Sequence, residues 1–279
     1  MPAEGKMKEV TSVVNAVKDA KIQCPLVGSW TNFVTINLVA NTQLAVGGRA
    51  AMCFLPDEAK PLAFVSKSTY INVGTLQPVA LQALTEAAKA AVELGKPWVL
   101  DPVAAGLGDT RTQLLNALKQ YKPSVIRGNA SEIIALANLW GIQTEKKGKV
   151  EGVDSTDTVD AALSSALELA KWTGGAVAIS GETDIVLDIN NTYRISGGSA
   201  MLKSITGAGC SLGGVIAVYA GVADPLTAAL TGSVVYKYAS ERAAKKGMGT
   251  FSFQTAFVDN LSLLNADEVE KYAKSHINS

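Results

Sequence analysis

The chain has 279 residues, of which 48% are hydrophobic and 18% charged, and its 25 basic and 25 acidic side chains give a formal net charge of zero. No basic excess points to nucleic acid or an anionic membrane as a partner. No run of about 18 apolar residues predicts a membrane span, and the polar N-terminus argues against a signal peptide. We therefore expect a soluble cytoplasmic protein, with enough chain for one large domain or two small ones.

Helical and strand patterns alternate along most of the chain. In chain order, they predict a helix at 7–20, a helix at 32–46, strands at 50–54 and 69–73, a helix at 77–94, a strand at 97–100, a helix at 110–121, a strand at 124–127, helices at 131–139 and 158–173, and strands at 176–180, 185–189 and 192–195. Asn190-Asn191 predicts a hairpin between the last two strands, and the chain from Cys210 onward predicts only helices. This alternation indicates an α/β fold with a mainly parallel sheet and helices on both faces.

Several polar or glycine residues directly follow predicted strands. They are Gly74, Asp101, Arg127 and the pair Gly181-Glu182. Ligands of such sheets bind beyond the carboxyl ends of the strands, so we expect these residues to converge on one edge of the sheet.

The most informative stretch is 205–213, with the sequence Ile-Thr-Gly-Ala-Gly-Cys-Ser-Leu-Gly. Gly207 and Gly209 allow a tight turn, and the apolar run after it predicts a helix. Gly207, Ala208 and Gly209 would then direct free N–H groups and the helix dipole at a bound anion. The alternative interpretation is a plain helix-entry turn. Cys210 would have its thiol pKa lowered by the dipole, or would simply be a small buried residue.

A second polar cluster covers residues 127–132. Arg127 suits a fork contact to a phosphate, while Asn129 and Glu132 share one face of a helix start and suit a hydrated Mg²⁺. The same pair could instead form a capping box. Asp101 is either a turn-maker or a ligand of metal and water, and the polar residues from Ser180 onward could form a turn.

Cysteine and histidine contents narrow the chemistry further. Cys24, Cys53 and Cys210 suit neither a disulfide framework nor metal-ligand spacing. His276 is the only histidine, which removes histidine-based triads and histidine metal sites from consideration.

Taken together, these segments resemble hydroxyethylthiazole kinase, a family of the ribokinase-like superfamily. The matching pieces occur in order at 25–27, 31–35, 40–41, 72–76, 101–103, 125–133, 152–155, 180–184 and 206–210. The most specific are 127–132, Arg-Gly-Asn-Ala-Ser-Glu, and 206–210, Thr-Gly-Ala-Gly-Cys.

The resemblance implies one ribokinase-like domain over residues 1–279 that transfers the γ-phosphoryl group of ATP to 4-methyl-5-(2-hydroxyethyl)thiazole in thiamine salvage. It further implies a homotrimer with the thiazole pocket between subunits. The implied roles are Arg127, Ser180 and Asp101 for ATP; Asp101, Glu132 and Asn129 for Mg²⁺ through water; Gly207, Ala208, Gly209 and Cys210 for the reacting phosphates; and Met52, Gly207, Asn32 and Gly74 for the thiazole.

Two segments depart from the pattern of bacterial relatives. Residues 28–32 read Gly-Ser-Trp-Thr-Asn where those relatives usually have His-Cys-Ile-Thr-Asn, and the segment before Met52 also differs. Both segments are expected near the thiazole, where Trp30 would add bulk and Arg49 a charge. A kinase for another small alcohol, such as a pyrimidine or a sugar, is therefore an alternative.

Two other classes of protein fit the motifs less well. Gly207, Gly209 and Gly213 also spell a dinucleotide fingerprint, but that motif opens a βαβ unit, and no strand is predicted after Gly221. A non-catalytic sensor of nucleotide or thiazole would not need the acidic residues that suit a metal.

Overall fold

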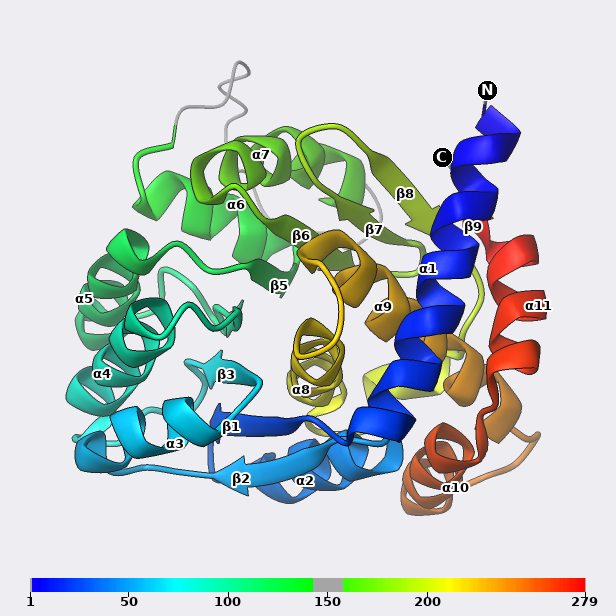
Figure 1. Cartoon of the computed structure of the whole chain (residues 1–279), viewed down its shortest axis with the longest axis horizontal. Helices are drawn as coiled ribbons and strands as arrows, with labels where there is room; N and C mark the ends of the chain where they lie inside the picture. Colours follow the sequence, from blue (N-terminus) through cyan, green and yellow to red (C-terminus); the bar gives the residue numbers. More distant parts are fainter. Residues whose placement is uncertain (1, 143–157, 279) are drawn as a thin grey trace.

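The computed structural model describes residues 2–142 and 158–278. One sheet in the order β2-β1-β3-β4-β5-β6-β7-β8-β9 runs through it. From β2 to β6 every neighbouring pair is parallel, whereas β7, β8 and β9 pair antiparallel at one edge. The predicted mainly parallel sheet is confirmed, with an antiparallel edge as the refinement (Figure 1).

The strands match the short apolar runs of the sequence. They are β1 (Leu26–Trp30), β2 (Arg49–Met52), β3 (Ser68–Asn72), β4 (Trp98–Asp101), β5 (Val125–Asn129), β6 (Ala176–Ser180), β7 (Asp184–Leu187), β8 (Thr192–Ile195) and β9 (Ile277–Asn278).

The α-helices lie on both faces of the sheet. They are α1 (Pro2–Gln23), α2 (Ile36–Ala45), α3 (Ala59–Val65), α4 (Ala80–Glu93), α5 (Asp109–Leu118), α6 (Ala130–Leu139), α7 (Thr158–Thr173), α8 (Ala208–Ala220), α9 (Pro225–Ala243), α10 (Thr250–Leu263) and α11 (Ala266–His276).

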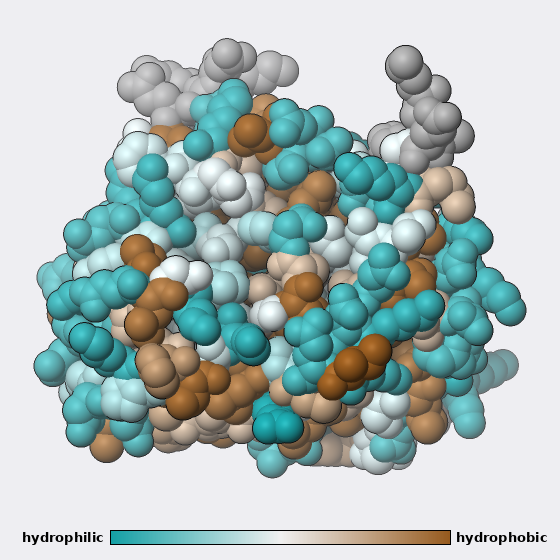
Figure 2. Space-filling view, in the orientation of Figure 1, coloured by the Kyte–Doolittle hydropathy of each residue, from teal (hydrophilic) through white to brown (hydrophobic). Residues whose placement is uncertain are grey.

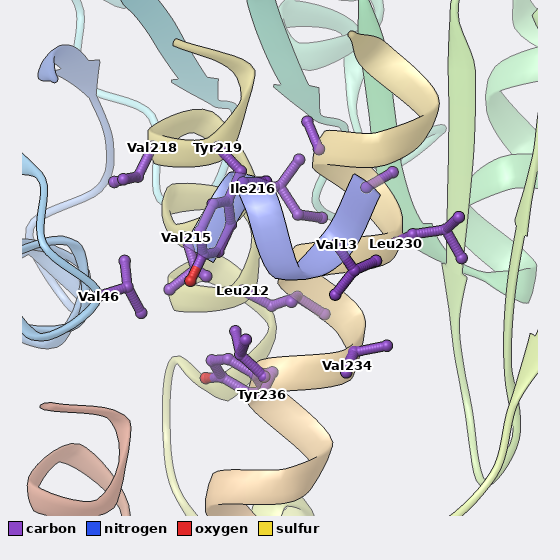
Figure 3. Close-up of a cluster of buried hydrophobic side chains, with 14 of the residues drawn as sticks. Val13, Val46, Leu212, Val215, Ile216, Val218, Tyr219, Leu230, Val234 and Tyr236 are labelled. Atoms are coloured by element: carbon purple, nitrogen blue, oxygen red, sulfur yellow. The ribbon is translucent and has the colours of Figure 1, made fainter. Parts of the chain in front are cut away.

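Alternate residues of the central strands enter two separate hydrophobic clusters. Val99 and Val125 pack with α1, α8, α9 and α11, whereas Leu100 and Ile126 pack with α3 to α7. Successive side chains of a strand point to opposite faces, so a buried strand is apolar throughout. Figure 3 shows the first cluster, in which Val215 and Ile216 of α8 lie among side chains of α1 and α9. Helix α8 is thereby held rigidly over the sheet.

Among the α-helices and strands, three elements were not predicted, and several boundaries are displaced, since α1 begins at Pro2 and α4 at Ala80. β1 and α3 were missed, and β9 corrects the prediction that the chain is helical from Cys210 to its end. β9 pairs antiparallel with β8, so it forms no βαβ unit and the argument against a dinucleotide fold stands. The helix predicted at 32–46 begins at Ile36 because the Asn32 side-chain oxygen accepts hydrogen bonds from the amides of Val34 and Thr35, which holds a turn there.

The hairpin prediction is confirmed, since β7 and β8 pair antiparallel around Asn190-Asn191. The motif at 152–155 and the whole polar stretch at 143–152 lie outside the described residues. Within the described ranges, no helix combines the length and the apolar character that crossing a membrane requires.

Candidate active site

The carboxyl ends of four adjacent parallel strands bring the predicted residues together. Asn72 of β3 is in register with Asp101 of β4, and Asn129 of β5 with Ser180 of β6. Arg127 lies two residues before the end of β5, and its side chain is buried with 7% exposure. The expected convergence of Asp101, Arg127 and the end of β6 on one edge is therefore seen.

A buried polar chain links three of these strands. Arg127 Nη1 lies 3.4 Å from Asp101 Oδ2, and Arg127 Nη2 donates to Ser180 Oγ at 2.5 Å. Burial raises the pKa of Asp101 to about 6, although the nearby guanidinium acts in the opposite direction. Arg127 therefore supplies the positive charge that keeps an acid at the base of the site ionised.

The glycine loop at 207–209 lies against the Arg127 guanidinium. Gly207 has φ of +90° and precedes α8, and a Cβ there would lie 2.8 Å from Thr35 Cγ2. A Cβ on Gly209 would lie 2.6 Å from Arg127 Nη1. Both glycines therefore permit a close approach that a larger residue would obstruct.

The first turn of α8 is well suited to hold an anion. Its leading amides, from Ala208 to Cys210, have no carbonyl partner within the helix. Tyr236 anchors the turn from below by donating to the Ala208 carbonyl at 2.6 Å. The positive helix end and the Arg127 guanidinium thus face the same space, which is the arrangement that binds a phosphate.

Tyr70 and Asn72, which sequence reasoning missed, connect the acid to the glycine loop. Asn72 Nδ2 donates to Asp101 Oδ2 at 3.1 Å, and its Oδ1 accepts from Asn32 Nδ2 at 2.9 Å. The Tyr70 hydroxyl lies 2.6 Å from the Cys210 carbonyl oxygen and 3.0 Å from Asp101 Oδ2. Polar residues inside the strand predicted at 69–73 were the available signal, because a buried strand end at this edge of a parallel sheet faces the site.

Cys210 does not behave as the helix dipole alone predicts. Burial, followed by the charge of Asp101, raises the pKa of its thiol, whereas the sequence argument expected a lowered value. The thiol is half-buried, and Asn32 Nδ2 lies 3.7 Å from its sulfur. Desolvation and a neighbouring carboxylate outweigh the dipole here, so the thiol form is favoured at neutral pH.

The cluster around Glu132 combines a helix cap with a second acid. Asn129 Oδ1 accepts from the Glu132 amide at 2.9 Å, and Glu132 Oε2 accepts from the Asn129 amide at 2.8 Å, which is a capping box. Glu132 Oε1 also accepts from the Ala104 amide at 3.1 Å. The Glu132 charge raises the pKa of Asp101, so the two carboxylates repel each other electrostatically.

Two of the predicted substrate residues, Gly74 and Asn32, lie against each other. Gly74 donates its amide to Asn72 Oδ1 at 2.9 Å, and a Cβ on Gly74 would lie 2.9 Å from Asn32 Nδ2. Met52, at the end of β2, is half-buried against the first hydrophobic cluster. A pocket of about 330 Å³, counting the space that opens to solvent, lies beside Gly74. Its lining includes Trp30, Phe33, Phe54, Asn72, Gly74 and Leu84.

The two departures from the family pattern separate in the structure. Trp30 is 1% exposed and lines that pocket, so it shapes the wall of the pocket. Arg49 begins β2 and pairs with Leu26 at the opposite edge of the sheet, roughly 10 Å along the strand from Met52 at 3.3 Å per residue. Whether Arg49 brings a charge to the substrate stays a prediction, because the pocket is expected between subunits.

The architecture is shared with a group of small-molecule kinases. A ribokinase-like superfamily protein from Enterococcus faecalis V583 superposes with a TM-score of 0.59 at 12% identity, covering 88% of this chain and 87% of that chain. That similarity shows that the chain has a ribokinase-like fold.

More specific comparisons define the family. Residues 17–267 match the model of the Hydroxyethylthiazole kinase family. The hydroxyethylthiazole kinase of Bifidobacterium adolescentis is 51% identical over 92% of each chain. The structure of a hydroxyethylthiazole kinase protein from Pyrococcus horikoshii OT3 superposes with a TM-score of 0.83 at 28% identity, covering 95% of this chain and 97% of that chain. The chain belongs to the hydroxyethylthiazole kinase family and is an enzyme.

Proposed function

We propose that this chain transfers the γ-phosphoryl group of ATP to the hydroxyl of 4-methyl-5-(2-hydroxyethyl)thiazole, a salvage step toward thiamine. The observation that supports it most is the position of the α8 N-terminus between two sets of residues. Arg127 and Ser180 lie on one side, where a nucleotide would enter, and Asn32 and Gly74 lie on the other. Membership of the family supplies the substrate class.

The phosphates would bind at the start of α8. Amides of Ala208, Gly209 and Cys210 would donate to them, and Arg127 would balance their charge from the β5 side. Phosphoryl transfer depends mainly on positioning and charge stabilisation, and these donors are held before substrate arrives. Ser180 keeps the arginine oriented through its short hydrogen bond.

Asp101 and Glu132 are the residues that would hold Mg²⁺ through water. Asp101 Oδ1 is buried and has no hydrogen-bond partner among the described residues, so it is free to accept from a metal-bound water. Asn129 suits this role less well than predicted, because its Oδ1 already accepts from the Glu132 amide and the Ser131 hydroxyl. Bound Mg²⁺ would neutralise part of the phosphate charge.

Replacement of Cys210 by Ala is expected to lower kcat about tenfold, which is less than the roughly 10²–10⁴-fold that a proton-transfer group contributes. The raised thiol pKa leaves little thiolate to take the proton of the alcohol, so the side chain would mainly position the acceptor. Steady-state turnover measures the loss of kcat. Cys24→Ala is the matched control, because Cys24 lies just before the amino end of β1, away from the site. A loss near 10⁴-fold would instead make Cys210 an essential base.

We also propose a homotrimer of one-domain subunits in the cytoplasm. Large apolar side chains stand exposed, including Phe33 at 52%, which lines the pocket, and Phe64 at 72% and Val65 at 59% at the end of α3. In Figure 2, hydrophobic side chains gather at the surface over α3 and α4. Such a surface is typical of a subunit contact. Light scattering is expected to give the mass of three chains of 29.0 kDa each, and the mass of one chain would reject the trimer.

ADP release tests the proposed reaction. With MgATP and the thiazole alcohol, we expect turnover that requires both the alcohol and the metal, with the thiazole monophosphate detected by mass. Pyridoxine and ribose serve as comparison alcohols, since Trp30 alters the acceptor side. Faster turnover of either one would move the substrate to another alcohol, and absence of nucleotide binding would reject the kinase site.

A further inference from the structure

Lys237 of α9 is a buried cation for which the proposed reaction has no role. It is 5% exposed, and its ammonium group is surrounded by oxygen atoms. These are the carbonyls of Glu182 at 2.8 Å, Gly197 at 3.2 Å and Gly181 at 3.4 Å, and Asp184 Oδ1 at 3.4 Å. An ammonium group has three protons to donate and a positive charge, so it matches this cage of oxygen atoms.

The oxygens come from two separate segments. Gly181 and Glu182 lie in the turn between β6 and β7, and Asp184, the first residue of β7, accepts from the Gly181 amide at 2.9 Å. Gly197 belongs to the segment that follows β8. Its neighbour Gly198 has φ of +85°, and a Cβ there would lie 3.1 Å from Lys237 Cγ. The pairing of β7 with β8 brings the two segments close, with Asp184 in register with Ile195, and Lys237 adds direct bonds from α9 to carbonyl oxygens of both segments.

Both segments lead directly into the phosphate site. The turn begins one residue after Ser180, which accepts the hydrogen bond from Arg127. The segment after β8 continues through the short 3₁₀ helix Ala200–Ser204 to Gly207 and the start of α8. Ser240, one turn beyond Lys237, accepts from the Ser199 amide at 3.0 Å and so fixes the second segment to the same face of α9.

The local charges require the lysine to be present. Burial raises the pKa of Asp184, and the Lys237 ammonium opposes that rise. Without the cation, the buried Asp184 carboxylate would lie close to several carbonyl oxygens with no positive charge to offset their repulsion. The turn after Ser180 would then move outward toward water.

From this arrangement we infer that Lys237 is a positioning residue for the nucleotide. Its ammonium fixes the turn after β6 relative to the segment entering α8, and so sets the separation between Ser180 with its arginine and the amides that receive the phosphates. The inference rests on the proposed function, and it concerns ATP affinity and not the acceptor alcohol.

The test compares Lys237→Ala with Lys237→Met. Alanine leaves a space lined by oxygens that a free ammonium ion can enter, whereas methionine fills the space without a charge. For each variant, KM for ATP, KM for the thiazole alcohol and calorimetric ADP affinity are measured with ammonium chloride or choline chloride at equal ionic strength. Leu118→Ala, in the other hydrophobic cluster, is the control for a general loss of stability.

We expect Lys237→Ala to raise KM for ATP about tenfold and to change KM for the alcohol less than about threefold. Ammonium is expected to restore most of the ATP affinity of the alanine variant and none of that of the methionine variant. An unchanged ATP affinity, an equal effect on both substrates, or equal rescue of both variants would overturn the inference.

Two arrangements keep this test decisive. If the single variants do not fold, Lys237→Met with Asp184→Asn removes both buried charges and is expected to fold while still binding ADP weakly; wild-type ADP affinity in it would overturn the inference.

ADP affinity is measured apart from turnover. A wild-type protein that binds ADP without phosphorylating the alcohol would reject the proposed function and leave the test of Lys237 intact.

Discussion

Replacement of Arg127 by Met is expected to lower kcat/KM for ATP about 10³-fold, at the upper end of what loss of one preorganised charged donor costs. The guanidinium is buried, pairs with Asp101 and bonds Ser180, and it faces the backbone of Gly209. Methionine keeps much of the volume and removes the positive charge that faces the phosphates. Steady-state kinetics and calorimetric ADP binding measure the loss.

Two controls separate catalysis from folding in this variant. Arg194→Met removes an exposed arginine of β8 that pairs with Asp160, and it should leave kcat/KM unchanged. Loss of Arg127 also leaves Asp101 as an unpaired buried charge, which costs about 3–5 kcal/mol, so melting must be followed for both proteins. A folded Arg127→Met protein that keeps more than a tenth of wild-type kcat/KM would reject the proposed phosphate contact.

The second large effect is expected from Gly207→Ala, with about a 10²-fold fall in kcat/KM, as for loss of an oxyanion donor. Gly207 has φ of +90°, and the added Cβ would press on Thr35 at 2.8 Å. The start of α8 would shift, and its amides would no longer point at the phosphates. Turnover and ADP affinity are both expected to fall.

Gly174→Ala is the matched control for this substitution. Gly174 has φ of +75°, and a Cβ added there would meet no atom within 4 Å. It precedes β6, at the edge of the sheet opposite the site. Both variants should lose roughly 1–2 kcal/mol of stability from the left-handed backbone. Only Gly207→Ala should lose activity, and equal activities of the two would show that the glycine is needed for folding alone.

Much of the fold follows from local pattern. Apolar runs such as 97–100 and 176–180 predicted strands that the structure contains, because strands buried on both faces need continuous hydrophobic sequence. β1 was missed since Gly28 and Ser29 interrupt its apolar run, and α3 is only 7 residues long. β9 has 2 residues, and it exists only because β8 offers a free edge.

The sequence by itself determined the class of fold and the residue types at the site. Gly207, Asp101 and Arg127 could be found because a glycine-rich helix entry and polar residues after buried strands have local signatures. The tertiary structure alone decided which residues meet. It placed Tyr70 and Asn72 between Asp101 and Cys210, and raised the pKa of the Cys210 thiol by burial and by Asp101. These results depend on desolvation and on contacts between residues distant along the chain, and a local pattern carries neither.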